Sequence, residues 1–429
     1  MAIGNGTIVL ILLGTLWLGG LIYCLLGLAA ARRLREEARS ALTPPFVASL
    51  LKPLLGSERN LEQNLESFFQ QDYPDYEILF GVSREDDPAL EIVERLRRKY
   101  PERDVQVVIA AASPYPNAKV YSMQRMARVA RGQVLVISDS DVSVTPDYLR
   151  AVISGFADRQ TGVVTCLYRG VPGASLWSRL EALGMSTRFM PGILAAWALE
   201  DRKSTGIQFA LGPTMAIRRE CLRAIGGFSA MANYLADDFV LGKWAAKHGF
   251  RVVLSPYVLN HHVLGESFAA TFRHQLRWAR STRSSRPLGY IGELFTHPTA
   301  LAAMVAVWGL TRAGMPISLA AAILAVTLAL RWSVSYEVGC GVLHDSEIRR
   351  SWWLIPLGDL LGFAIWLCGF TGRKIYWRGI AYRVGSDGRF EPLEADAAAG
   401  HGHNTSIRTI AEEELAAAGS DHIHRAGRQ

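Results

Sequence analysis

Apolar residues gather in two stretches of the chain that are long enough to meet a membrane. Residues 7–31 contain no charged side chain, and a membrane-spanning helix needs about 20 apolar residues. Arg32, Arg33 and Arg35 follow this run directly, so the positive-inside rule places the chain after them in the cytoplasm. A cleaved signal peptide is the alternative, but its basic residues would precede the apolar run. We therefore expect residues 1–44 to form a retained N-terminal transmembrane anchor and a basic linker.

The second apolar stretch lies in residues 297–372 and is broken into three pieces. These are residues 301–310, 315–330 and 352–370. Tryptophans lie mostly near the ends of the pieces, as is typical of aromatic side chains at a membrane interface. This pattern predicts two or three C-terminal transmembrane or interfacial helices. Residues 373–429 are expected to be a cytoplasmic segment that ends in an acidic, disordered tail.

Between the two apolar stretches, residues 45–296 alternate between strand-like and helix-like patterns. The runs at residues 46–51, 76–82, 105–110 and 134–137 are strand-like, and helical patterns separate them. Strands that alternate with helices predict an α/β fold with a parallel sheet, in which ligands bind beyond the carboxyl ends of the strands. No G-x-G-x-x-G sequence follows the first strand and no Walker-type glycine loop occurs. This disfavours a dinucleotide-binding fold and a nucleoside triphosphatase.

Two carboxylates follow the last of these strands at a spacing of two residues. The apolar run ends at Ser138 and leads into Asp139 and Asp141, and residues i and i+2 point to the same side of an extended chain. Their carboxylates can therefore converge on Mg²⁺ or Mn²⁺, with phosphate oxygens as the remaining ligands. The alternative is a turn in which one aspartate caps the next element, since D-x-D occurs often by chance.

Acidic residues occur at two other places that could reach the same edge of the sheet. Asp87 follows the strand-like run 76–82, so it lies at the same edge as the carboxylate pair. Asp237 and Asp238 precede a helical pattern, where acidic residues are favoured by the helix dipole. The other interpretation is that one of the pair is a general base, whose basicity the neighbouring charge raises.

A helical pattern in residues 266–286 carries a basic stripe, formed by Arg273, Arg277, Arg280 and Arg283. This helix could lie on anionic lipid, or it could offer an arginine to a departing diphosphate. The net charge of +7 also admits nucleic-acid binding, but the flanking apolar stretches favour lipid or diphosphate, and we expect no nucleic-acid partner. Five cysteines without C-x-x-C spacing exclude a disulfide scaffold.

Several short segments together resemble the ceramide glucosyltransferases, which are family 21 of the glycosyltransferases. The segments are SLLKPL (49–54), FFQQDYP (68–74), DPAL (87–90), NAK (117–119), SDSD (138–141), LADDF (235–239) and the pair Arg277-Trp278. As a set they are specific, and they cover roughly residues 47–290. VTCLYRG (164–170) and LWSR (176–179) are also similar to the bacterial hopanoid-biosynthesis glycosyltransferases.

The resemblance implies a GT-A fold, the α/β fold of nucleotide-diphospho-sugar transferases, for residues 45–296. It also implies roles for four carboxylates. Asp87 would contact the nucleotide, and Asp139 and Asp141 would bind the diphosphate of the sugar nucleotide through the divalent cation. Asp238 would be the catalytic base.

The resemblance implies further roles for basic and aromatic residues. Arg277 and Trp278 match the end of the (Q/R)xxRW motif and would belong to the catalytic site, with Arg277 also near the donor. The first position of this motif is His274 instead of Gln or Arg. Lys52 and Lys119 match basic positions near the nucleotide.

The activity implied is that of a membrane-bound inverting glycosyltransferase that moves a sugar to the hydroxyl of a lipid such as ceramide. Glucose from UDP-glucose is the favoured donor sugar. The alternatives are a hopanoid-biosynthesis N-acetylglucosaminyl transferase and, less favoured, a processive polysaccharide synthase, which would need more spans. The protein is expected to be a multi-pass membrane protein, in the bacterial inner membrane or an equivalent membrane, with its catalytic domain in the cytoplasm.

An apolar segment at residues 173–198 interrupts the α/β block. One interpretation is ordinary core. The other is an interfacial segment that shapes a channel for the lipid acceptor, with Trp177, Phe189 and Trp197 as its anchors.

Overall fold

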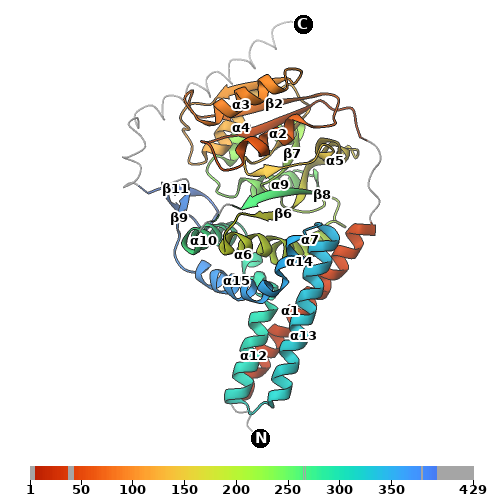
Figure 1. Cartoon of the computed structure of the whole chain (residues 1–429), viewed down its shortest axis with the longest axis vertical. Helices are drawn as coiled ribbons and strands as arrows, with labels where there is room; N and C mark the ends of the chain where they lie inside the picture. The colour runs from red at the N-terminus through yellow and green to blue at the C-terminus, as the bar shows by residue number, and fades with distance from the viewer. Residues whose placement is uncertain (1–4, 37–42, 264, 266, 378–379, 394–429) are drawn as a thin grey trace.

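Three long helices project from one end of an α/β domain (Figure 1). In the computed structural model, which describes residues 5–36, 43–263, 265, 267–377 and 380–393, these are α1 (Asn5–Glu36), α12 (Pro298–Arg312) and α13 (Ile317–Ser335). Within the described residues, the stretches Gly6–Glu36, Ile317–Val342 and Glu347–Gly369 are long and apolar enough to cross a membrane, and the bent pair Pro287–Thr296 with Pro298–Arg312 could be a fourth span. The expectation of one N-terminal and two to three C-terminal membrane helices is confirmed.

The α/β domain is built on an eight-stranded sheet in the order β3-β2-β1-β4-β7-β6-β8-β5. Its strands are β1 (Ala48–Pro53), β2 (Tyr76–Val82), β3 (Val105–Ile109), β4 (Val134–Ile137), β5 (Val142–Ser143), β6 (Thr161–Pro172), β7 (Met215–Arg218) and β8 (Arg251–Val263). The first four strands are parallel, as the sequence predicts, and β7 runs antiparallel to both β4 and β6. Because β1, β2 and β4 are parallel neighbours, the loops that follow them meet at one edge of the sheet.

Helices flank this sheet in the alternation that the sequence predicts. They are α2 (Leu61–Phe69), α3 (Ala89–Lys99), α4 (Ala118–Val129), α5 (Tyr148–Ser154), α8 (Arg219–Ala224) and α9 (Asp237–Lys247). All residues of β1, β2 and β4 are buried, as expected of strands covered on both faces. In α3 the buried residues Ala89, Ile92, Val93 and Leu96 form one apolar side, which is the helical periodicity seen in the sequence.

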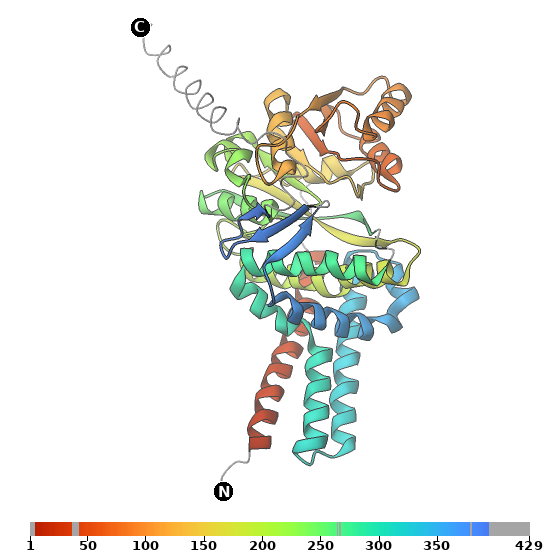
Figure 2. The same ribbon diagram turned by 90° about the vertical axis from the view of Figure 1, so that its left-hand side faces the viewer.

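A layer of helices separates the sheet from the long helices (Figure 2). It contains α6 (Leu176–Gly184), η1 (Met185–Phe189), α7 (Met190–Glu200), α10 (Phe268–Ser285), α11 (Pro287–Gly292), α14 (Glu347–Ser351) and α15 (Ile355–Gly369). Trp197 of α7 is buried, and the Arg33 guanidinium of α1 lies 4.4 Å from its ring centroid. Trp197 therefore belongs to the core between α7 and α1 and does not line an acceptor channel.

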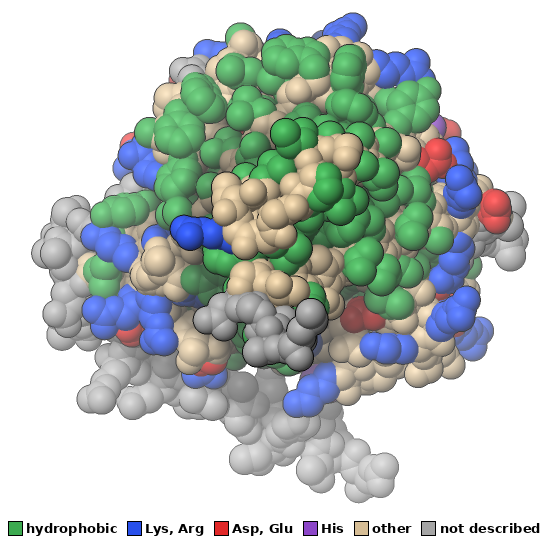
Figure 3. Space-filling view, turned by 90° about the horizontal axis from the view of Figure 1, so that it is seen from below, with side chains coloured by type: hydrophobic (Ala, Val, Ile, Leu, Met, Phe, Trp, Pro, Cys, Tyr) green, Lys and Arg blue, Asp and Glu red, His purple; other side chains and the backbone are tan. Residues whose placement is uncertain are grey.

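The face from which the long helices project is largely apolar. Figure 3 views it from below and shows hydrophobic side chains over most of its area, with Lys and Arg side chains around the edge. Exposed side chains of α11 and α15 that contribute apolar surface are Leu288, Ile291, Leu357, Leu360 and Leu367. An apolar surface rimmed by basic side chains is typical of a protein face that rests in a membrane interface.

A second, three-stranded sheet forms after the last apolar helix. Its strands are β9 (Lys374–Trp377), β10 (Ile380–Val384) and β11 (Phe390–Pro392), in the order β11-β10-β9. The sequence analysis assigned no element to this segment. The disorder expected for the acidic tail concerns residues 394–429, which lie outside the described part of the chain.

The position of this small sheet restricts the path of the chain through a membrane. The amide of Phe390 donates to the carbonyl of Asn233 at 2.9 Å, so β11 and the α/β domain lie on the same side of the membrane. The chain between Thr296 and Lys374 must therefore cross an even number of times. The α12–α13 hairpin, which runs alongside α1, provides two crossings, whereas α15 lies across the bundle beneath α6 and α10 in Figures 1 and 2. With the hairpin as the two crossings, α15 would lie along the membrane, although the stretch Glu347–Gly369 is also long and apolar enough to span it.

A buried ion pair joins the membrane helices to the helical layer. Arg331 of α13 donates to both carboxylate oxygens of Asp359 of α15 at 2.8 and 2.7 Å, and Thr299 of α12 donates to the same carboxylate at 2.7 Å. Arg331 also donates to the carbonyl of Thr187 in η1 at 2.9 Å. Four elements thus depend on one pair whose members are each 2% exposed.

Replacing Asp359 by Ala should strongly destabilise the protein, because it leaves the Arg331 guanidinium buried without its counter-ion. The expected loss of unfolding free energy is about 3–5 kcal/mol, measurable as a lower Tm in detergent. The double variant Arg331→Met/Asp359→Leu is the control and should recover most of the stability, since an apolar pair removes the buried charge as well. An unchanged Tm for Asp359→Ala would contradict this role.

Candidate functional site

The carboxylate that follows β4 is held by a lysine from α4. The Nζ of Lys119 lies 2.7 Å from Oδ1 of Asp139 and 3.7 Å from Oδ2 of Asp237. Lys119 is placed there because Asn117 caps α4, accepting a hydrogen bond from the amide of Val120 at 3.2 Å. Burial opposes the charge of Asp139, but the Lys119 ammonium outweighs it and holds the pKa of this carboxyl below its usual value.

Asp238 and Asp139 come close together beside a glycine. Asp238 is the second residue of α9, about a hundred residues after Asp139. A Cβ placed on Gly212 would lie 3.2 Å from Oδ2 of Asp238 and 3.7 Å from Oδ2 of Asp139. The two carboxylates therefore face one small open position, and any larger residue at 212 would contact both.

The environment of Asp238 makes its carboxylate a stronger base than usual. Burial, and next the charge of the adjacent Asp237, raise the pKa of Asp238 to about 6, although Lys119 opposes the shift. Its Oδ1 accepts a hydrogen bond from the amide of Phe239 at 2.7 Å. A carboxylate with a pKa close to neutral pH can take a proton and release it again, as a general base must.

Asp141 lies beside a histidine that the sequence analysis did not single out. The Nε2 of His261, on β8, is 3.5 Å from Oδ2 of Asp141, because β5 and β8 pair directly at Val142 and His261. The His261 ring lies 5.5 Å from the ring of Tyr168 and 6.3 Å from that of Trp278. The available signal was a pair of histidines near the end of a long strand, just before the basic helix.

The helix α10 brings Trp278 to this histidine. The Nδ1 of His274 lies 2.5 Å from Oε1 of Glu181 on α6, and the His274 ring is 4.5 Å from that of Trp278. His274, which replaces Gln or Arg in the motif, therefore contacts a buried carboxylate of the helical layer. Arg277 precedes Trp278 on α10 and is partly buried.

The other half of the basic stripe contacts protein carbonyl groups. Arg280 donates to the carbonyls of Thr371 and Lys374 at 3.1 and 2.5 Å. Arg283 donates to those of Gly369 and Gly372, both at 2.6 Å. The guanidinium groups of these two arginines thus have hydrogen-bond partners within the protein. Their bonds connect the end of α15 and the start of β9 to α10.

Lys52, near the end of β1, and Asp87, in the loop after β2, lie at the same edge of the sheet. The Nζ of Lys52 donates to the backbone carbonyl of Asp139 at 2.5 Å and lies 3.7 Å from the ring centroid of Phe68, and burial lowers its pKa to about 7. Asp87 accepts hydrogen bonds from the amides of Gly56 and Ala89, each at 2.9 Å. Asp87 therefore shapes the loop after β1, and within the described part of the chain no hydrogen bond joins it to Asp139 or Asp238.

The donor atoms around Asp139 and Asp141 fit a hard divalent cation. Oδ1 of Asp141 and Nδ1 of His261 are buried without a hydrogen-bond partner in the described structure, so each has bonding capacity left. Carboxylate oxygens are the ligands that Mg²⁺ and Mn²⁺ prefer. Among the described residues, no group of three or more acidic, His or Cys side chains is already arranged around a metal position, so further ligands would come from the substrate.

Aromatic side chains connect the carboxylates of Asp139, Asp141 and Asp238, here called the acidic cluster, to the helical layer beneath the sheet. Tyr168 is 5% exposed, and burial together with the charges of Asp238, Asp141 and Asp139 raises its pKa. Its ring lies 5.9 Å from that of Phe189 of η1, which is 43% exposed. A partly exposed ring of the helical layer thus packs against a ring beside the carboxylates.

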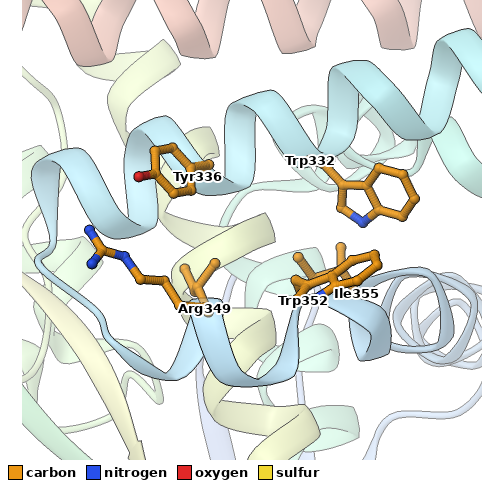
Figure 4. Close-up of a pocket in the computed structure, with 6 residues that line it drawn as sticks. Trp332, Tyr336, Arg349, Trp352 and Ile355 are labelled. Carbon is orange, nitrogen blue, oxygen red and sulfur yellow. The ribbon is translucent and has the colours of Figure 1, made fainter.

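A separate cavity of about 380 Å³ lies at the end of α13, away from these carboxylates (Figure 4). It is lined by Trp332, Tyr336, Ile348, Arg349, Trp352 and Ile355. Its walls come from α13, η4 (Tyr336–Val342), α14, η5 (Trp352–Leu354) and α15. The cavity is apolar except for Arg349 and shares no residue with the acidic cluster.

Comparison with known proteins supports the resemblance seen in the motifs. The model of glycosyl transferase family 21 matches residues 12–390. Ceramide glucosyltransferase 3 of Caenorhabditis elegans is 26% identical over 249 residues, which are 58% of this chain and 53% of that protein. The ceramide glucosyltransferase of Komagataella phaffii is 32% identical over 115 residues, 25% of this chain and 23% of that protein. The chain thus spans about half the length, or less, of these relatives.

A solved structure is also similar to this chain. A mannosyltransferase from Pyrobaculum calidifontis, in complex with GDP-Man and Mn²⁺, gives a TM-score of 0.49 at 18% identity and covers 83% of this chain and 97% of that one. Together with the match to the family model, the mixed sheet confirms the GT-A fold expected from the sequence.

Proposed function

Because the chain belongs to glycosyl transferase family 21, we propose that it is an inverting transferase that moves a sugar from a UDP-sugar to a lipid hydroxyl. Glucose is the proposed sugar and ceramide the proposed class of acceptor. The observation that carries the proposal is the approach of Asp238 and Asp139 across Gly212, with Lys119 between Asp139 and Asp237. The proposed base and a carboxylate proposed to bind the diphosphate through a cation would thus lie within one small volume.

In the proposed reaction, Asp238 takes the proton of the acceptor hydroxyl as its oxygen attacks the anomeric carbon. A hydroxyl is a poor nucleophile at neutral pH, so a carboxylate within hydrogen-bond reach is needed. The bond from the anomeric carbon to the diphosphate oxygen breaks at the same time, and the nucleoside diphosphate leaves. One base opposite one leaving group gives inversion, and hence a β-glycoside from an α-linked donor.

The donor diphosphate would be bound at the edge of the sheet beyond β4. Asp139 and Asp141 would hold Mg²⁺ or Mn²⁺, and such a cation stabilises the negative charge that develops on a departing diphosphate. Lys119 and Arg277 are the proposed cationic side chains near the leaving group. Lys52 and Asp87 would fix the loop against which the nucleotide lies.

The acceptor would approach from the membrane-facing layer. The support is the contact between Phe189 and Tyr168, which links exposed apolar surface to the carboxylates. Basic residues Arg32, Arg33 and Arg35 follow the N-terminal span, so we place the catalytic domain in the cytoplasm. A lipid hydroxyl at the cytoplasmic interface and a water-soluble donor would then meet at one site.

The pH dependence of transfer should report the ionisation of Asp238. Because the base must be deprotonated and its pKa is raised to about 6, kcat/KM should be low below this pH and rise to a plateau above it. An exposed aspartate, with a pKa of about 3.9, would give no loss near pH 6. A profile that stays flat from pH 7 to pH 4.5 would contradict this assignment.

The proposed activity is tested by incubating membranes that contain the protein with radiolabelled UDP-glucose or UDP-N-acetylglucosamine. We expect label from UDP-glucose in an organic-soluble lipid whose sugar is released by a β-glucosidase. Labelled lipid from UDP-N-acetylglucosamine alone would favour a hopanoid-type transferase, and a labelled polymer would favour a polysaccharide synthase. No transfer from either donor, in membranes supplied with ceramide, would contradict the proposal.

A further inference from the structure

The small C-terminal sheet is joined to the segment that leads into the acidic pair. The amide of Leu235 donates to the carbonyl of Gly388 at 3.2 Å, and the amide of Phe390 donates to the carbonyl of Asn233 at 2.9 Å. Tyr234 and Arg389 pair as an antiparallel bridge between these bonds. Residues 233–235 thus pair with β11 along the edge of the small sheet, and this segment ends three residues before Asp238.

Side chains reinforce this junction. Leu235 is 7% exposed and belongs to an apolar cluster that is separate from the main core, and the other buried members are Ile375, Tyr382, Val384 and Phe390. The rings of Tyr382 and Phe390 lie 4.9 Å apart. Leu235 therefore contributes its side chain to the C-terminal sheet.

The opposite side of the same segment is held by the residue that positions Lys119. The side-chain amide of Asn117 donates to the carbonyl of Tyr234 at 2.9 Å, and its backbone amide donates to the carbonyl of Ala232 at 3.1 Å. Asn117 is also the cap of α4. The segment before Asp237 is thus clamped between the start of α4 and the C-terminal sheet.

The sheet also contacts α10, the helix of Arg277 and Trp278. Arg280 donates to the carbonyl of Lys374 at the start of β9, and a Cβ on Gly388 would lie 3.2 Å from the hydroxyl of Ser285. Gly388 has a φ of 84°, a backbone conformation that other residues rarely adopt. The turn before β11 therefore fits closely between the end of α10 and Leu235.

We infer that the β9–β11 sheet is a positioning element for Asp238, and that Leu235 and Phe390 are the residues through which it acts. The inference rests on the proposed function, in which Asp238 is the base. The sheet sets where α9 begins, and so where Asp238 lies relative to Asp139. None of the strand residues named here contacts the proposed cation-binding carboxylates, so loss of the sheet should affect turnover more than donor binding.

The test replaces Phe390 by Ala and measures kcat and the KM for the donor. Displacement of a catalytic group by about 1 Å can cost about 10²-fold, so kcat should fall by about 10- to 10²-fold while the KM for the donor stays within about twofold. Phe390→Leu should restore most of kcat, and Glu391→Ala, at an exposed position of β11, should leave kcat unchanged.

Leu235→Ala tests the same contact from the other side. It should lower kcat to a similar extent, and the double variant with Phe390→Ala should be no worse than either single variant by more than about twofold, since both changes remove one interaction. The inference would be overturned if the losses in kcat of the two single variants multiplied in the double variant. It would also be overturned if the donor KM rose in both variants by as much as kcat fell.

Amide hydrogen exchange separates this inference from the proposed activity. The amide of Leu235 should exchange faster in Phe390→Ala than in the unchanged protein, whereas amides of β1 and β2 should keep their protection. This result is measurable even if the unchanged protein transfers no sugar, an outcome that would reject the proposed function alone. Unaltered exchange at residues 233–238 would reject the positioning role.

Discussion

Replacing Asp238 by Asn should lower kcat for sugar transfer by about 10²–10⁴-fold, the contribution of a positioned general base. The amide has nearly the shape of the carboxylate but cannot take the proton of the acceptor hydroxyl. Donor binding should be largely kept, because the proposed cation-binding residues are Asp139 and Asp141. The measurement is initial rates of lipid glycosylation, together with the affinity for UDP determined by calorimetry.

Two comparisons make this result specific. Asp72→Asn removes a carboxylate whose side chain is 75% exposed, and it should leave kcat unchanged. Asp237→Asn removes the neighbouring charge that raises the pKa of Asp238, so it should shift the pH profile to lower pH. Turnover of Asp238→Asn within about tenfold of the unchanged protein would refute the assignment of this residue as the base.

Removal of divalent cations should abolish transfer, and added Mg²⁺ or Mn²⁺ should restore it. The reason is that Asp139 and Asp141 are the proposed ligands of a cation that would bind the diphosphate. One oxygen of Asp141 is buried without a hydrogen-bond partner in the described residues. Asp141→Asn should raise the cation concentration for half-maximal rate by about 10- to 100-fold or more. Substitution of residues that only orient metal ligands already lowers metal affinity by that much. Rates are measured in EDTA and during cation titration.

The control for this experiment is His261→Gln, which removes the imidazole next to Asp141 but keeps a polar side chain. It should raise the cation concentration for half-maximal rate less than Asp141→Asn does, because the carboxylate remains. Full activity of the unchanged protein in EDTA, after exhaustive dialysis, would rule out the proposed role of the cation.

Much of the α/β domain could be predicted from local pattern. The buried runs of β1, β2 and β4 appear in the sequence as continuous apolar segments, because both faces of these strands are covered. The carboxylates Asp139 and Asp141 could be singled out for the same reason, since a buried strand ends just before them. Their position at the edge of a parallel sheet follows from topology.

The pairing across Gly212 could not be predicted from residue pattern. The distance between Asp139 and Asp238 is set by where β7 and α9 pack, and neither periodicity nor spacing encodes this. The motif resemblance named both residues, but Gly212 and His261 lay outside it. Their significance depends on neighbours that are distant in sequence.

The strands of the C-terminal sheet could not be predicted either, for a different reason. Its strands have three to five residues and mix basic with aromatic side chains, so no clear alternation stands out. Nothing in the basic stripe of α10 indicated that two of its members, Arg280 and Arg283, bind backbone carbonyls of this region. An arginine satisfied by main-chain oxygens has the same sequence pattern as one that awaits an anion.

The bridge between Tyr234 and Arg389 joins residues 155 positions apart, and every membrane-associated helix from α10 to α15 is synthesised between them. Asp237 and Asp238 are therefore translated before these helices, and the supporting strands β9–β11 are translated after them. A nascent chain therefore carries the acid pair without these strands until α12, α13 and α15 have entered or met the bilayer. Membrane insertion can therefore precede completion of the site around Asp238. A premature stop after α15 would leave an anchored α/β domain without the β9–β11 sheet.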